Sequence, residues 1–149
     1  MNNYLSSSIP KRSLRKTGRK IVLEQIEKNN ILGKYEIFDK YLYLTTVDPI
    51  SKNTKEEYKL CIAKQCNAKE EIIYKKIKDV IPAMKKYNTF AINVERRGDH
   101  KFTSTELARE LAGSVFDIFP EINVDLGKPE LTVHVKVINN KCLLYTEEK

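Results

Sequence analysis

The sequence predicts a mixed α+β and α/β fold, in which a small N-terminal unit precedes a larger mixed sheet with helices on one face. Segments with helical periodicity alternate along the chain with segments whose apolar residues follow the two-residue period of a strand. The length of 149 residues suits one ordinary domain or two very small ones. A hydrophobic content of 41% is enough for a real core, although tryptophan is absent.

The first part of the chain predicts a basic arm followed by a small α+β unit. We expect residues 1–13 to be flexible and residues 14–66 to fold. The expected elements are a helix at 14–29, one strand or a tight hairpin at 35–47, a polar loop at 48–55 and a short strand at 58–63. Because two strands on one helix leave an incomplete core, this unit would need a neighbour.

The second part, residues 67–149, predicts a helix, a strand, a long helix, a short strand and a hairpin. The expected elements are a helix at 68–81, a strand at 90–95, a helix at 104–118, a short strand at 122–126 and strands at 131–138 and 141–145. Pro82 and Pro120 follow the two helices, and proline ends a helix. Asn139-Asn140 suits a two-residue hairpin turn, because asparagine tolerates positive φ.

The long helix has the best-marked start in the chain. Thr103 and Glu106 match a capping box, in which each side chain bonds the backbone N–H of the other residue. Phe102 and Leu107 occupy the flanking positions of a hydrophobic staple. Gly113 is unfavourable within a helix by about 1 kcal/mol relative to alanine, so we expect close packing there.

The positive charge is uneven along the chain. The net charge is +7, but residues 1–87 carry +9 and residues 88–149 carry −2. Six basic residues and no acidic residue fall within 11–20, and such a block attracts polyanions. A solubilising, partly disordered arm is the alternative interpretation.

Catalytic motifs are not visible. Phosphate-binding loops of the Walker type and dinucleotide-binding glycine fingerprints are missing, and the two histidines stand apart from any local cysteine or carboxylate pattern. Cys61, Cys66 and Cys142 lack the paired spacing of a zinc site, so buried free thiols are the better interpretation. We therefore expect no catalytic residue, no metal, no cofactor and no enzyme activity.

The sequence also lacks targeting and membrane signals. No apolar run approaches the ~20 residues that a membrane span needs. The N-terminal segment is charged but has no apolar stretch behind it, unlike a secretory signal. We expect a cytoplasmic protein without a membrane partner, and the odd number of cysteines agrees with that location.

The segment from Phe90 to Tyr145 resembles the THUMP domain, an RNA-binding module of tRNA-modifying proteins. Three stretches carry the resemblance: FAINVERRGDHKFTSTELARELAG at 90–113, VDLGKPELTVHVKV at 124–137 and KCLLY at 141–145. The resemblance implies a THUMP domain at 67–149 preceded by a small ferredoxin-like unit. It also implies that the two units together grip the acceptor end of tRNA.

The resemblance implies a non-catalytic adaptor that presents tRNA to a modifying enzyme, most similar to the THUMP-only adaptor of the RNA cytidine acetyltransferase that makes N4-acetylcytidine. An RNA-binding component or fragment of a tRNA thiouridine synthetase or tRNA methyltransferase is the second hypothesis. A basic protein that binds nucleic acid by charge alone is the third.

Twelve basic residues are the candidate RNA contacts. They are Lys11, Arg12, Arg15, Lys16, Arg19, Lys20, Arg96, Arg97, Lys101, Arg109, Lys128 and Lys136. Arg96, Arg97 and Lys101 flank a strand-to-helix junction, where the free N–H groups of the helix start favour phosphate. Ion pairs of these arginines with Glu95, Asp99 or Glu110 are the alternative.

Overall fold

The computed structural model describes residues 1–82 and 85–148, so the last residue of the predicted second domain, Lys149, lies outside it. The chain forms two compact units, Met1–Ile62 and Ala63–Lys149. The predicted mixed fold is confirmed in both. The predicted boundary between residues 66 and 67 lies at the end of strand β4 (Cys61–Asn67), whose first residues pair in the first unit and whose remaining residues pair in the second.

The first unit has the βαββαβ order of a ferredoxin-like fold. Its elements are β1 (Asn2–Ser6), a 3₁₀ turn at Lys11–Ser13, α1 (Leu14–Asn29), β2 (Gly33–Phe38), β3 (Tyr41–Thr46), α2 (Lys52–Glu57) and the start of β4. The strands pair antiparallel in the order β2-β3-β1-β4. Leu14 and Ile21 of α1 belong to the same buried core cluster as Leu42 and Leu44 of β3.

The prediction of a flexible arm at 1–13 is wrong. Residues 2–6 form β1, which pairs with β3 on one side and with β4 on the other. Tyr4 and Leu5 are buried, and the Tyr4 hydroxyl accepts a hydrogen bond from the backbone N–H of Ile50 at 3.3 Å. Partners more than 30 residues away order this segment, and its own sequence shows no strand pattern.

The expected polar loop at 48–55 instead contains α2. Ser51 caps this short helix, because its hydroxyl accepts a hydrogen bond from the N–H of Thr54 at 3.2 Å. Between β2 and β3 the predicted hairpin forms about Asp39, which has a φ of 52°.

Gly18 allows α1 to approach β2 closely. A Cβ at this position would lie 2.6 Å from the ring of Tyr35 and 3.0 Å from a methyl group of Leu42. We expect Gly18→Ala to destabilise the first unit by about 1–3 kcal/mol, because the overlap outweighs alanine's better helix propensity. Thermal melting would measure the change. Thr17→Ala, on the same helix, is the control. A melting midpoint of Gly18→Ala equal to or above that of the wild type would contradict this prediction.

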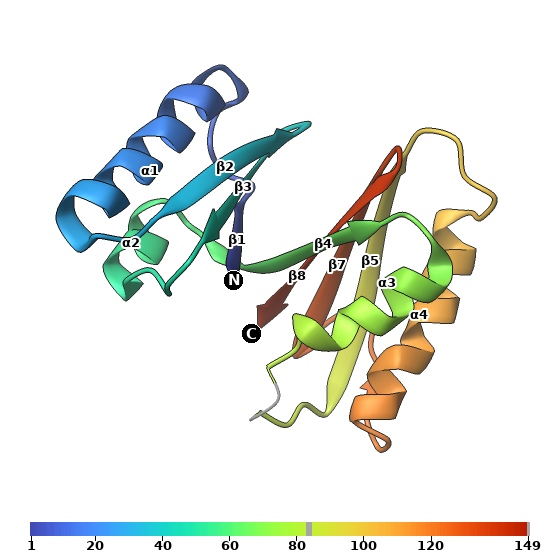
Figure 1. Ribbon diagram of the computed structural model, residues 1–149. Helices are drawn as coiled ribbons and strands as arrows, with labels where there is room; N and C mark the ends of the chain where they lie inside the picture. Colours follow the sequence, from blue (N-terminus) through green and yellow to red (C-terminus); the bar gives the residue numbers. More distant parts are fainter. Residues whose placement is uncertain (83–84, 149) are drawn as a thin grey trace. The chain divides into compact units, whose positions relative to one another are not determined.

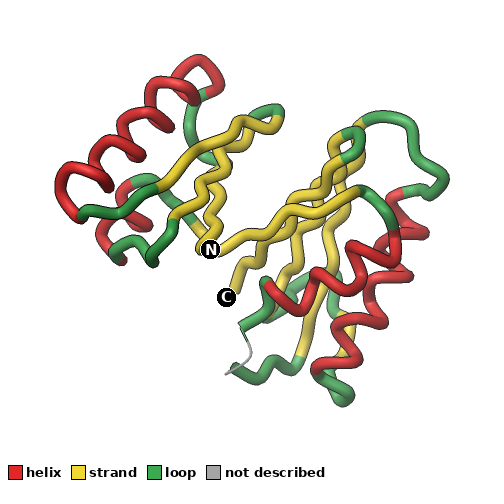
Figure 2. The backbone as a smooth tube through the Cα atoms, in the orientation of Figure 1, coloured by secondary structure: helices red, strands yellow, loops and turns green. Residues whose placement is uncertain are grey.

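The second unit has a mixed sheet with both helices on one face (Figures 1 and 2). Beyond β4 its elements are α3 (Glu70–Lys76), a 3₁₀ turn at Ile77–Asp79, β5 (Thr89–Arg97), α4 (Ser104–Ile118), β6 (Asn123–Val124), β7 (Leu131–Ile138) and β8 (Lys141–Glu148). The strand order is β4-β8-β7-β5-β6, in which β5 runs parallel to β6 and β7 while the other pairs are antiparallel.

The predicted helix start at Thr103 is confirmed. The Thr103 hydroxyl accepts from the N–H of Glu106 at 3.1 Å, and the Glu106 carboxylate accepts from the N–H of Thr103 at 3.0 Å. These bonds to the carboxylate hold the pKa of Glu106 below its usual value. Leu107 and Leu111 of this helix pack against the valines of β7.

Two other local predictions in the second unit are confirmed. The hairpin between β7 and β8 turns at Asn139, which has a φ of 52°. A Cβ on Gly113 would lie 3.0 Å from the Tyr74 hydroxyl, so α3 and α4 pack closely there.

In the described part of the chain, no helix combines the length and apolar character that a bilayer crossing requires.

Candidate nucleic-acid interface

The basic segment at 11–20 lies on the outer side of α1 and the turn that precedes it. Leu14, Gly18 and Ile21 are buried toward the sheet at helical spacing. This spacing turns the basic residues of the helix outward, and those of the preceding turn are exposed as well. The six exposed basic residues are Lys11, Arg12, Arg15, Lys16, Arg19 and Lys20. We call these six residues the α1 basic face. The sequence predicted its charge, and the fold makes it an ordered surface.

The α1 basic face is little neutralised by neighbouring acids. A shallow depression of about 630 Å³ runs along it, lined by five of its residues together with Leu23, Glu24 and Glu27. Among the described residues, Lys20 of this face forms an ion pair with Glu24 at 4.0 Å. Closely spaced cations that outnumber the neighbouring carboxylates produce a positive potential that attracts a phosphate backbone.

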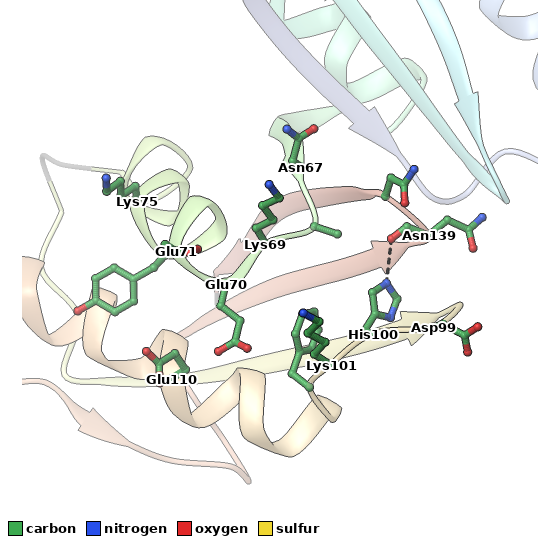
Figure 3. Close-up of a pocket in the computed structure, with 14 residues that line it drawn as sticks. Asn67, Lys69, Glu70, Glu71, Lys75, Asp99, His100, Lys101, Glu110 and Asn139 are labelled. Atoms are coloured by element: carbon green, nitrogen blue, oxygen red, sulfur yellow. Dashed lines mark hydrogen bonds between the residues drawn. The ribbon is translucent and has the colours of Figure 1, made fainter.

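A second candidate surface is a groove in the second unit, where three segments of the chain meet. It encloses about 1350 Å³ and is bounded by the start of α3, the β5–α4 junction and the β7–β8 turn (Figure 3). We call it the junction groove. Its residues are Asn67, Ala68, Lys69, Glu70, Glu71, Tyr74, Lys75, Asp99, His100, Lys101, Phe102, Glu110, Asn139 and Asn140.

His100 organises one wall of the junction groove. Arg96 Nη1 lies 3.2 Å from His100 Nδ1 and donates to the carbonyl of Gly98 at 3.1 Å. Because a guanidinium can only donate, Nδ1 must be the acceptor, so Nε2 carries the proton and donates to the carbonyl of Asn139 at 2.8 Å (Figure 3). The imidazole also stacks on buried Phe102, with ring centres 5.2 Å apart. Arg96 is therefore held in one orientation by the loop.

The charge of the junction groove is mixed. Lys69, Lys75 and Lys101 supply positive charge, whereas four acidic residues line the same space: Glu70, Glu71, Asp99 and Glu110. In Figure 3, Glu70 and Glu110 are drawn to the left of Lys101. The groove should therefore attract polyanions less strongly than the α1 basic face does. Any binding there would depend on the shape of the ligand more than on its charge.

The structure separates the predicted contacts of the second unit. Lys101 lines the junction groove. Arg96 does not line it but contacts His100, which does. Arg96 contacts Gly98 and His100. These are not the acidic partners that the alternative interpretation named, which are Glu95, Asp99 and Glu110. Arg97 and Arg109 are exposed near the junction but do not line the groove.

Two predicted contacts do not belong to this cluster. Lys136 is bound to Glu95 at 2.9 Å across β7 and β5, so its ammonium already has a partner. Lys128 follows β6, which pairs with the first residues of β5, whereas Arg96 is near the last. At about 3.3 Å per residue, these two ends of β5 are roughly 20 Å apart. Lys136 and Lys128 therefore lie outside the junction cluster, and their contact with RNA stays a prediction.

Sequence reasoning missed several residues of the junction groove. Lys69 and Asn139 come from distant parts of the chain and meet because β4 pairs with β8. In the sequence, His100 stands apart from any cysteine or carboxylate pattern, and only its contacts with Arg96 and Asn139 show its structural role. Within residues 1–82 and 85–148, no three His, Cys, Asp or Glu side chains are grouped to hold a metal ion.

The chain combines two compact units with an exposed basic face on the first of them. The family profile described as "THUMP domain" matches residues 67–147, more than half of the chain. The chain belongs to the THUMP domain family.

Relatives were found in both sequence and structure. A tRNA sulfurtransferase of Vibrio campbellii is 35% identical over 69 residues, which make up 46% of this chain and 14% of that protein. The crystal structure of PH1313 from Pyrococcus horikoshii has a TM-score of 0.69 at 17% identity, covering 99% of this chain and 55% of that one. A 4-thiouridine synthetase, solved with RNA and ATP, has a TM-score of 0.61 at 16% identity, covering 99% of this chain and 41% of that one.

These relatives correct the prediction that the protein is not an enzyme. The similar sequence is named as a tRNA sulfurtransferase, and one structure of the same fold is named as a 4-thiouridine synthetase. The chain spans 14% of the sulfurtransferase and about half or less of the two solved chains. None of the three points to the adaptor of the RNA cytidine acetyltransferase.

Proposed function

We propose that this chain supplies the tRNA-binding part of a tRNA-thiolating system. The observation that carries the proposal is the α1 basic face, six exposed cations on one ordered surface of a chain that also contains a THUMP domain. Such a surface neutralises successive phosphates, while loops of the second unit add contacts that depend on shape.

Sulfur transfer is favoured over the other modifications by sequence. A tRNA sulfurtransferase is 35% identical over 69 residues of this chain, and the THUMP profile matches residues 67–147. The structural likeness to the 4-thiouridine synthetase extends over 99% of the chain, but at 16% identity it speaks for the fold alone. Acetylation and methylation remain as alternative outcomes of the test below.

The junction groove would give the binding of tRNA its specificity. Its lysines can meet phosphates, and the ring of His100, backed by Phe102, offers a surface on which an unpaired base can stack. The α1 basic face would supply most of the affinity and the groove most of the discrimination between folded and unstructured RNA.

Nucleoside analysis of tRNA tests the proposed function. In cells that lack the gene, tRNA digested to nucleosides should lose a thiolated nucleoside, and the wild-type gene should restore it. A variant gene should restore the thiolated nucleoside poorly if it carries glutamine in place of Arg12, Arg15, Lys16 and Arg19. If thiolated nucleosides persist while an acetylated or methylated nucleoside disappears, the assignment to thiolation is wrong. If every nucleoside persists, the role in tRNA modification is wrong.

Arg96 should contribute to the preference for folded tRNA. We expect Arg96→Ala to reduce that preference about 10-fold, because it removes a charge-assisted contact of ~1–2 kcal/mol from a guanidinium that the loop holds in place. Competition binding of folded tRNA against unstructured RNA of equal length, at one salt concentration, measures the ratio.

Arg96→Lys is the matched control for charge. It keeps the positive charge but lacks the planar group that reaches both Gly98 and His100. We expect it to keep the affinity for unstructured RNA and to lose part of the preference. Equal weakening of both RNAs by Arg96→Ala would show that the arginine acts only as diffuse charge.

A further inference from the structure

Two of the three cysteines lie opposite each other in the sheet of the second unit. Cys66 of β4 and Cys142 of β8 are direct partners in the antiparallel register. Both contact the helix-covered core of this unit. Opposed residues in antiparallel strands have Cα atoms roughly 4.5–5.5 Å apart, and a disulfide accepts about 4.4–6.8 Å. The backbone therefore already has the spacing that a cross-strand disulfide needs.

The two thiols differ in exposure and acidity. Cys66 is half-buried, whereas Cys142 is fully buried. A hydrogen bond from the Cys142 thiol lowers the pKa of Cys66, with help from the ammonium groups of Lys76 and Lys141, although burial opposes the effect. The same hydrogen bond, together with burial, raises the pKa of Cys142. Cys66 is thus the thiol that an external reagent meets and the one that ionises first.

The third cysteine is placed differently. Cys61 precedes Cys66 by five positions on β4, so its side chain points to the opposite face of the strand. Its sulfur lies 3.5 Å from the carbonyl of Leu5 in the first unit. Cys61 therefore serves as an internal control for reactivity.

We propose that Cys66 and Cys142 form a reversible thiol–disulfide modification site that reacts with low-molecular-weight disulfides such as glutathione disulfide. The Cys66 thiolate attacks one sulfur of glutathione disulfide, forms a mixed disulfide and releases one glutathione thiolate. Cys142 then loses its proton, attacks the Cys66 sulfur and releases the second glutathione. Two protein thiols are oxidised, and one glutathione disulfide is reduced to two glutathione molecules. This inference is independent of RNA binding.

The disulfide would join two neighbouring strands, β4 and β8, that are far apart in sequence. A cross-link between distant residues restricts the unfolded chain and so favours the folded state. Asn67, which follows Cys66 directly, lines the junction groove, so the cross-link would also restrain that wall. We expect oxidation to raise the melting midpoint of the second unit by at least ~5 °C.

The test is oxidation of the full chain with glutathione disulfide, followed by thiol titration, unreduced peptide mapping by mass spectrometry and thermal melting. Free thiols should fall from three to one, and the mapped disulfide should join Cys66 to Cys142. Dithiothreitol should restore all three thiols and the original midpoint. An unchanged thiol count, a stable glutathione adduct on Cys66 or a disulfide that includes Cys61 would overturn the proposal.

Two variants complete the test without disturbing the buried position. Cys66→Ser changes the more exposed partner, so the chain should fold but form no cross-link and show no oxidative rise in midpoint. Cys61→Ser should form the cross-link as the wild type does. If Cys66→Ser shows the same oxidative rise as the wild type, another group is responsible and the assignment is wrong.

Discussion

Replacement of Arg12, Arg15, Lys16 and Arg19 together by glutamine is expected to lower the affinity for tRNA about 100-fold near 0.1 M salt. Each lost phosphate contact should also reduce the slope of log affinity against log salt by about one, so the slope should fall by three to four. All four side chains are exposed on α1 or the turn before it, so their replacement should leave the fold intact. Binding titrations at several salt concentrations measure both quantities.

A charge-matched control separates this face from net charge. Lys34, Lys40, Lys52 and Lys59 are also exposed in the first unit but lie outside the α1 basic face. Their joint replacement by glutamine removes the same charge and should change the affinity far less. Equal loss in the two variants would mean that tRNA responds to the overall charge, and the α1 basic face would then have no special role.

Deletion of residues 1–6 is expected to abolish cooperative unfolding of the first unit. The deletion removes β1, which lies between β3 and β4, together with the buried side chains of Tyr4 and Leu5. Burial of two such side chains contributes about 3–6 kcal/mol. A unit this small has only about 5 kcal/mol of net stability, so the loss is comparable to the whole. Urea unfolding followed by circular dichroism and proteolysis would detect it.

The glutamine variant of the α1 basic face is the control for this deletion, because it changes the same region of sequence and leaves β1 intact. It should unfold like the wild type, whereas the truncated chain should be cleaved rapidly within residues 7–62. A truncated chain with the wild-type midpoint and amplitude would show that β1 is dispensable. Residues 1–13 would then behave as the flexible arm that the sequence predicted.

Features whose partners lie within a few residues could be predicted from the sequence. The start of α4 is one, because Thr103 and Glu106 bond each other across a single turn. The β7–β8 turn is another, because Asn139 accepts positive φ by its own chemistry. The exposure of the four basic residues at 15–20 also follows locally, since the buried period of Leu14, Gly18 and Ile21 directs them outward.

The tertiary structure alone decided which distant residues meet. β1 has no strand pattern of its own and is ordered by β3 and β4. Lys136 alternates with apolar residues like any exposed strand residue, yet Glu95 of the neighbouring strand binds it. Likewise, the junction groove and the Cys66–Cys142 pair exist because β4 pairs with β8. Strand pairing joins residues without regard to their separation along the chain, so no local pattern in a single sequence specifies these contacts.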